Sequence, residues 1–309
     1  METPRIPRFL GALLHRRDTL AADREAERRH RWSRASPGLP PGLELQWLGT
    51  AGFRLSYRDF HLLIDPYLTR PGLRDLLSGC GLLPSLARIQ RYLPGPVNAV
   101  LLGHTHFDHA LDAPEIARLH DATVYGSRSL TNLMKACGLT RQSVEVEPHR
   151  AYEVGPFAVT FVPSLHSRLL AGLAVPFDGD IQSHASFPLT ASGYRCGQVF
   201  GIHIAVAGTS FYHQGSANLI ESEIEHRGVD YFLAAISGRG FTRDYVARIL
   251  GALEPRTVVP HHYDDFLRPL DQTPGFSFNV GLAQFVDDVR RTSPSIEIRT
   301  LAVLESTGG

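Results

Sequence analysis

The segment Gly103-His104-Thr105-His106-Phe107-Asp108-His109 places three histidines and one aspartate within six residues. Imidazole nitrogens and carboxylate oxygens are the ligands that zinc and similar transition metals prefer. In an extended segment alternate side chains point to the same side, so His104 and His106 can direct both imidazoles at one cation. Asp108 and His109 follow on the turn beyond and can face a neighbouring point. The segment therefore predicts a metal site.

The elements that must position this segment form an α/β pattern, because strand-like apolar runs alternate with amphipathic helical stretches. Two β-sheets sandwiched between helices would accommodate the order. We predict strands over Leu43–Leu48, Phe53–Tyr57, His61–Ile64, Val97–Leu102, Thr123–Tyr125, Ser143–Val146, Phe157–Val162, Val199–Ala207, Tyr231–Ala235, Thr257–Val259 and Ile296–Leu301. We predict helices over Asp112–His120, Ser129–Ala136, Ala217–His226, Arg243–Leu253 and Val280–Arg291.

The order of these motifs resembles that of the metallo-β-lactamase superfamily over most of residues 43–304. The resemblance implies an αββα sandwich of two mixed β-sheets flanked by helices, with a metal site at the edge of the sheets. Three further positions match the superfamily's signature. Asp65 follows an early strand, His166 follows a later strand, and the Pro-x-His-Tyr-Asp ending selects His262 over His261.

The resemblance also implies a role for each matched residue. One group of three nitrogens would leave a position open for water, as catalytic zinc requires; its members are His104, His106 and His166. A second group would hold a weaker metal or orient the water; its members are Asp108, His109 and His262. Asp65 would accept a hydrogen bond from a ligand imidazole, or form the turn at its strand end.

The sequence departs from the superfamily pattern at one position. Members usually carry an acidic metal-bridging residue in a Gly-Asp-Thr-like turn after a strand, but Val206–Ser210 has Thr209 there. We therefore expect one tight zinc and a weakened second metal. Thr209 would hydrogen-bond the attacking water or cap the turn. Three residues are candidates to replace the missing carboxylate: Asp178, Asp180 and Asp264.

The expected function is metal-dependent hydrolysis, in which a zinc-bound water or hydroxide attacks an ester, lactone, amide or phosphodiester and Asp108 accepts the proton. Trp47–Phe53 and the Pro-x-His-Tyr-Asp ending look closest to the branch with ascorbate-phosphate lactonases and N-acyl-phosphatidylethanolamine phospholipase D. The Leu-, Gly- and aromatic-rich stretches Tyr67–Leu93 and Leu169–Phe187 could line a pocket for a lipid-like rather than another small-molecule substrate. A phospholipid-class phosphodiesterase is thus one alternative, and a non-catalytic metal-binding protein is the second.

Composition narrows these alternatives. The chain has 309 residues, of which 43% are hydrophobic and 20% charged, as is typical of a folded globular protein. Its 31 basic and 31 acidic side chains give a net charge of zero, which disfavours a nucleic-acid partner. No apolar run approaches the roughly 18 residues that span a bilayer. Three cysteines without a C-x-x-C motif suit reduced thiols, and we expect a cytoplasmic protein.

Residues 1–42 read as an Arg-rich N-terminal arm that ends in a Pro/Gly linker, and residues 43–309 as the hydrolase domain. Nine arginines and five acidic residues give residues 1–34 a net charge of +4. A short amphipathic helix there could place the arm on an anionic membrane surface; its residues would be Arg5, Arg8, Phe9, Leu13, Leu14, Arg16 and Arg17. A solvated arm or one packed on a partner subunit are the alternatives, and the sequence leaves the oligomeric state open.

Overall fold

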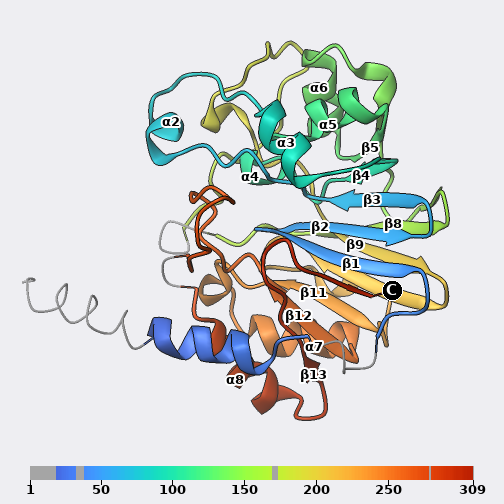
Figure 1. The fold of residues 1–309 in the computed structure, drawn as a ribbon, viewed down its shortest axis with the longest axis vertical. Helices are drawn as coiled ribbons and strands as arrows, with labels where there is room; N and C mark the ends of the chain where they lie inside the picture. The colour runs from blue at the N-terminus through green and yellow to red at the C-terminus, as the bar shows by residue number, and fades with distance from the viewer. Residues whose placement is uncertain (1–18, 33–37, 169–172, 278–279, 309) are drawn as a thin grey trace, which may run out of the picture.

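The computed structural model describes residues 19–32, 38–168, 173–277 and 280–308, and two seven-stranded sheets form its centre (Figure 1). The first sheet has the order β14-β1-β2-β3-β4-β5-β6. Its strands are β1 (Leu43–Gly49), β2 (Gly52–Tyr57), β3 (Phe60–Ile64), β4 (Ala99–Leu101), β5 (Thr123–Gly126), β6 (Ser143–Glu145) and β14 (Ser306–Gly308). β14 to β3 pair antiparallel, whereas β3 to β6 pair parallel, so the sheet is mixed.

The second sheet is also mixed and has the order β13-β12-β11-β10-β9-β8-β7. Its strands are β7 (Ala151–Val154), β8 (Phe157–Ser164), β9 (Val199–Val206), β10 (Thr209–Gln214), β11 (Tyr231–Ala235), β12 (Thr257–His261) and β13 (Glu297–Ile298). β7 to β10 pair antiparallel and β10 to β13 pair parallel. The predicted pair of mixed sheets is therefore confirmed.

Helices cover the outer faces of both sheets (Figure 1). Beside the first sheet lie α2 (Leu73–Leu77), α3 (Leu86–Tyr92), α4 (Phe107–Ala110), α5 (Ala113–His120) and α6 (Arg128–Ala136). Beside the second lie α7 (Tyr245–Leu253) and α8 (Leu282–Thr292). The buried residues of α6 recur at helical spacing, as Leu130, Leu133 and Met134. One apolar core fills the space between the sheets and continues to α7 and α8, and a second lies under the helices of the first sheet.

The predicted helix over Ala217–His226 is wrong. The described chain has only a 3-10 turn there, Glu221–Glu223. The sequence reading also missed β7, β10 and β14. The omission of β10 matters most, because the predicted strand Val199–Ala207 does not lead into a helix. It turns back at Ala207 and Gly208, both with positive φ (50° and 73°), into a further strand.

The described part of the predicted arm packs on the domain. Residues 19–29 form a helix beside α8 (Figure 1). Trp32 stacks on Tyr231 with ring centroids 5.3 Å apart. The residues assigned to membrane contact, Arg5 to Arg17, lie outside the described residues, so membrane contact stays a prediction. None of the helices in the described ranges is both long and apolar enough for a bilayer crossing.

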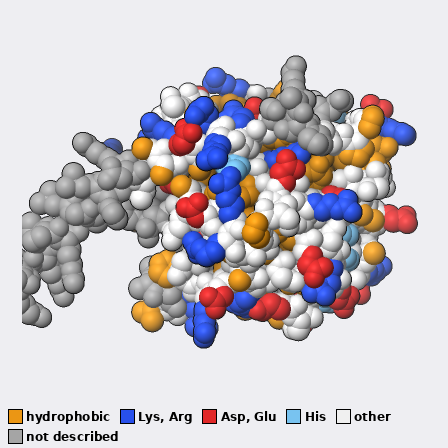
Figure 2. Space-filling view, turned by 90° about the horizontal axis from the view of Figure 1, so that it is seen from below, with side chains coloured by type: hydrophobic (Ala, Val, Ile, Leu, Met, Phe, Trp, Pro, Cys, Tyr) orange, Lys and Arg blue, Asp and Glu red, His pale blue; other side chains and the backbone are white. Residues whose placement is uncertain are grey.

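Surface charges are mixed on the face that Figure 2 shows. There Lys and Arg side chains are interspersed with Asp and Glu side chains. Many charged side chains of the described chain form local pairs, such as Arg291 with Asp288 at 3.1 Å. This face therefore offers no broad field of one sign to a polyanion.

The helix over residues 19–29 also caps α8. Gly281 at the start of α8 has no capping side chain, and Asp23 Oδ1 accepts the Ala283 N–H at 2.8 Å instead. We expect Asp23→Ala to lower the free energy of unfolding by about 1 kcal/mol, the usual cost of a lost cap. Urea unfolding measures this. The control Glu25→Ala removes an exposed carboxylate of the same helix and should change stability by less than about 0.5 kcal/mol; equal losses would contradict the capping role.

Candidate metal centre

The candidate metal ligands all follow the carboxyl ends of strands, where two sheets meet at one edge. Asp65 directly follows β3, and His104 lies in the loop after β4. From the second sheet, His166 comes two residues after β8 and His262 directly after β12. Carboxyl ends of parallel strands are the usual place for ligand sites in α/β folds. The structure thus brings together residues from four separate segments of the chain.

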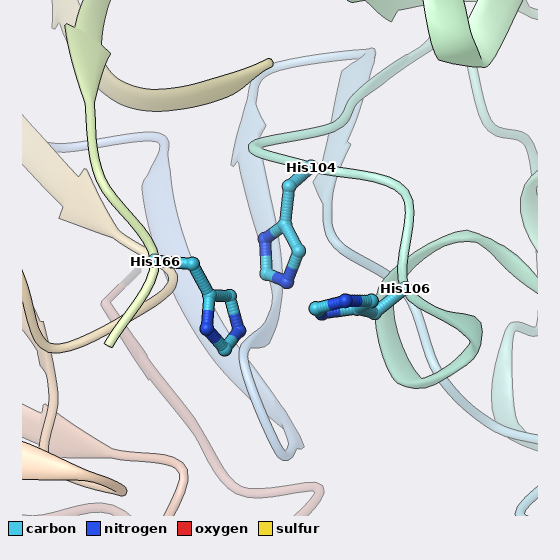
Figure 3. A group of neighbouring side chains, drawn as sticks. All are labelled: His104, His106 and His166. Carbon is cyan, nitrogen blue, oxygen red and sulfur yellow. The ribbon is translucent and has the colours of Figure 1, made fainter. Parts of the chain in front are cut away.

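Three histidines form the first group. The ligand nitrogens of His104, His106 and His166 lie within 4.8 Å of one another. Figure 3 shows the three rings converging on one space, and their centroids are 4.7 to 5.0 Å apart. Thr105 points away from this space, since its Oγ1 bonds to Ser129 Oγ at 2.8 Å. The predicted alternation along this segment is confirmed.

Hydrogen bonds to carbonyl groups fix the protonation of two of these rings. His106 Nε2 lies 2.7 Å from the Pro176 carbonyl oxygen, and His166 Nδ1 lies 2.7 Å from that of Ser167. Because a carbonyl can only accept, each of these nitrogens carries the proton and donates it. His106 Nδ1 and His166 Nε2 therefore keep their lone pairs for a metal ion.

A second group adjoins the first. The ligand atoms of Asp108, His109 and His262 also lie within 4.8 Å of one another. Asp108 Oδ2 is 3.4 Å from His262 Nε2 and 3.7 Å from His109 Nε2. Asp65 lies behind His109, because Asp65 Oδ2 accepts the His109 Nδ1–H at 2.8 Å and Oδ1 accepts the Gly103 N–H at 2.7 Å. His109 Nε2 thus stays free to bind a metal, and Asp65 orients the ring.

A metal ion suits the unsatisfied atoms of this site. His104 is 1% exposed, yet neither of its ring nitrogens has a hydrogen-bond partner in the described chain. Buried polar atoms are rarely left without a partner, because such burial costs free energy. Imidazole nitrogens with a carboxylate are also the donor set that zinc prefers. The residues present therefore fit a metal centre.

Electrostatics hold His104, His166 and Asp108 in metal-binding form. At His109 burial is outweighed by the carboxylates of Asp65 and Asp108, which raise the pKa of that imidazole. Burial lowers the pKa of His104 well below its usual value, and neighbouring imidazoles lower it further. Burial also lowers the pKa of His166 to about 3. Burial alone would raise the pKa of Asp108, but the imidazoles of His109 and His262 outweigh it and lower that pKa. Neutral imidazoles and an ionised carboxylate are the species that bind a dication.

The backbone at two of these residues is strained. Asp65 and His262 have φ values of 43° and 59°, in the left-handed region that non-glycine residues rarely adopt. Backbone bonds hold both conformations: Asp65 N donates to Leu101 O at 3.0 Å, and His262 N donates to Thr50 O at 2.9 Å. Strain of this kind persists only where surrounding contacts determine it, and it is concentrated at functional sites.

A buried ion pair supports the His262 turn. Arg70 Nη2 and Asp264 Oδ2 are 2.6 Å apart, and each side chain is 3% exposed. Asp264 Oδ1 accepts the Thr50 N–H at 2.8 Å, and the Thr50 carbonyl accepts the His262 N–H. Thr50 therefore links the ion pair to the His262 turn. Arg70 Nη1 also donates to the carbonyls of Asp265 and Arg268 at 3.2 Å. The sequence reading missed Arg70, and Asp264 is engaged by this pair rather than substituting for the bridging acid.

The structure overturns the expectation for Thr209. This residue begins β10 beside the turn and pairs with Val206. The opposite end of β10 faces the cluster, about 20 Å further along the strand. There a Cβ on Gly215 would lie 2.7 Å from Asp65 Oδ2 and 3.5 Å from His109 Cε1. Gly215 is therefore the strand-end residue beside the ligands, and it supplies no carboxylate.

The remaining candidates are not part of the cluster. His261 stacks on His213 in the core with centroids 5.0 Å apart, and His262 rather than His261 belongs to a ligand group. Asp178 and Asp180 are exposed, and neither belongs to a ligand group among the described residues.

Comparisons with known proteins give the family. The model of the beta-lactamase superfamily domain matches residues 61–263, which span every candidate ligand. The chain belongs to this superfamily. The predicted metallo-β-lactamase membership is thus confirmed, while the particular branch stays a prediction.

Curated relatives and solved structures agree with this membership. A "UPF0173 metal-dependent hydrolase" of Polynucleobacter asymbioticus is 27% identical over 75% of this chain and 78% of the relative. Another, from Ruegeria sp., is 29% identical over 72% of this chain and 87% of the relative. The structure of a metallo hydrolase from the archaeon Ignicoccus hospitalis has a TM-score of 0.56 at 20% identity and covers 85% of this chain and 97% of that one. This last likeness shows the shared fold.

The Arg70–Asp264 pair yields a stability prediction. We expect Arg70→Met to lower the free energy of unfolding by about 3–5 kcal/mol, because it leaves the Asp264 carboxylate buried without its partner. Chemical unfolding monitored by circular dichroism measures the loss. In the double variant Arg70→Met/Asp264→Leu no charge is left uncompensated, so its loss should be clearly smaller. Equal losses in the two proteins would contradict an ion pair as the source of stability.

Proposed function

We propose that the protein is a zinc-dependent hydrolase that cleaves an ester, lactone, amide or phosphodiester bond. Membership of a metallo-β-lactamase fold family and relatives named metal-dependent hydrolases support hydrolysis. The observation that carries the proposal is the convergence of ligand nitrogens from His104, His106 and His166. Backbone carbonyls hold the other nitrogen of His106 and of His166. A three-nitrogen centre with a position left open is typical of catalytic zinc.

The chain's own residues have separate tasks in this reaction. His104, His106 and His166 would hold one zinc ion, and Asp108, His109 and His262 would hold a second. Zinc supplies Lewis acidity and lowers the pKa of water. Asp108 lies beside His109 and His262 and lines the cavity that His106 and His166 also line. In the proposed reaction it orients the attacking water and accepts its proton. Asp65 acts through His109 and keeps that imidazole in place.

We expect His106→Ala and Asp108→Asn to fail in different ways. His106→Ala removes a nitrogen of the three-histidine group, so metal content and hydrolysis should be lost together. Asp108→Asn leaves those three ligands untouched, so it should keep that metal while turnover falls by about 10²- to 10⁴-fold, as is usual for a lost general base. Elemental analysis beside an ester, lactone, amide and phosphodiester screen measures both.

A histidine outside the centre serves as the control for these variants. His226 stacks on His203 with centroids 3.7 Å apart, and neither belongs to a ligand group of the described chain. His226→Ala should keep metal and turnover. Full turnover in metal-free His106→Ala would reject metal-dependent hydrolysis. A metal-loaded native protein that is inactive on all four bond classes would favour the non-catalytic alternative.

The end of β10 beside the ligands carries Gly215 and Ser216 rather than a carboxylate, which leads to a prediction on metal stoichiometry. A second dication would find Asp108 as its one carboxylate ligand, so we expect one tight equivalent of zinc and a second that binds at least about tenfold more weakly. Competition with a chromogenic chelator measures both constants. Thr209→Asp should change neither, because β10 carries that residue away from the cluster. Two equally tight equivalents in the native protein would refute the asymmetry.

A further inference from the structure

A small cavity lies directly over the metal ligands. Its volume is about 140 Å³, and His106, Asp108, His166 and His262 form its floor. For comparison of size, an engineered apolar cavity of about 150 Å³ in another protein binds benzene. A group of about six non-hydrogen atoms therefore fills this space.

The walls of the cavity are apolar. Three phenylalanines and a proline line it: Phe107, Phe177, Phe266 and Pro176. Phe177 stands edge-on to His106 with ring centroids 6.5 Å apart, and Phe266 stands likewise to His262 at 6.3 Å. The remaining lining residues are Ser167, Gly215, Ser216 and Ser237. Such walls favour an apolar group beside the ligands.

Hydrogen bonds fix the position of both walls. Pro176 O accepts from His106 Nε2, and Phe177 O accepts from Cys196 N at 2.9 Å. On the opposite side, Arg70 bonds to the carbonyls of Asp265 and Arg268, which flank Phe266. Among the described residues, hydrogen bonds to backbone carbonyls therefore hold both walls in place.

The cavity carries no positive side chain among its described lining residues, and its one carboxylate is Asp108. Three arginines line the adjoining cavity beyond His166. Arg248 is paired with Glu221 and Arg243 with Asp244, whereas Arg168 is exposed. An anionic group inside the cavity over the ligands would thus gain no Lys or Arg partner from its described lining residues.

We propose that the centre binds neutral carboxylic esters or lactones whose acyl group is apolar and holds at most about six non-hydrogen atoms beyond its carbonyl group. This inference rests on the proposed function and narrows its substrate class. In the reaction water adds to the carbonyl carbon and the acyl C–O bond breaks. The alkoxide leaves as an alcohol with the proton that Asp108 took from the water, the acid leaves as a carboxylate, and the second proton of the water passes to solvent.

The test compares p-nitrophenyl esters on the zinc-loaded full chain. We expect kcat/KM for hexanoate and benzoate to exceed that for decanoate at least about tenfold, because the decanoyl chain is too long for the cavity. They should exceed the adipate half-ester by a similar factor, because adipate adds a carboxylate. Bis(p-nitrophenyl) phosphate should be a poorer substrate than either preferred ester. Calorimetry should show benzohydroxamic acid binding more tightly than decanohydroxamic acid, which reports on the cavity without turnover.

Two matched variants locate the size limit. Phe177 is 38% exposed at the cavity, so Phe177→Ala should keep the fold and metal content while raising the decanoate-to-hexanoate ratio of kcat/KM at least about tenfold. Phe241→Ala alters a phenylalanine of the adjoining cavity and should leave the ratio unchanged.

The outcomes separate the two proposals. A native preference for decanoate, adipate or the phosphodiester, or tighter binding of decanohydroxamic acid, would overturn this inference and leave hydrolysis standing. Absence of turnover with the expected hydroxamate preference would instead reject the hydrolase function and support the cavity's ligand class.

Discussion

The burial of five imidazoles and two carboxylates at one edge of the sandwich is the constraint on which this structure depends. Each polar ring buried away from water costs free energy unless a partner meets it. Protein acceptors meet one nitrogen of His106, His109 and His166, and the converging nitrogens are left for a metal ion. Because these rings come from both sheets, the site forms only if the sheets pack in one register. The geometry of the site therefore depends on the same packing of the two sheets that stabilises the fold.

The sequence was sufficient where ligands directly follow apolar strands. Asp65, His166 and His262 each come within two residues of such a strand, so local pattern and motif order located them together with the His104–His109 segment. Side-chain alternation also separated His262 from His261, since neighbours in an extended chain face opposite ways. The two-sheet architecture followed from the same alternation of strands and helices.

The sequence failed where a buried strand is polar. β10 carries His213 and Gln214 inside the protein, both fully buried, so its hydropathy did not indicate a core strand. Without β10, the turn at Ala207 and Gly208 resembles the end of a strand, which is why the sequence pattern wrongly predicts Thr209 beside the metal. Gly215 then went unnoticed because a missing side chain leaves no signal. Long-range partners such as Arg70 with Asp264, or Asp23 with the start of α8, were equally beyond local patterns, since 194 and 260 residues separate them.

Shared anchors couple the cavity walls to the metal ligands. The carbonyl that fixes the tautomer of His106 belongs to Pro176, next to Phe177, and Arg70 serves both the His262 turn and the backbone around Phe266. A substitution that moves either wall therefore also perturbs a ligand, and metal geometry limits how far the cavity can change. Phe177 is the exception, because its backbone carries the contacts and its ring is partly exposed. Side-chain change at this residue is thus the route by which the fold could admit longer substrates without disturbing the ligands.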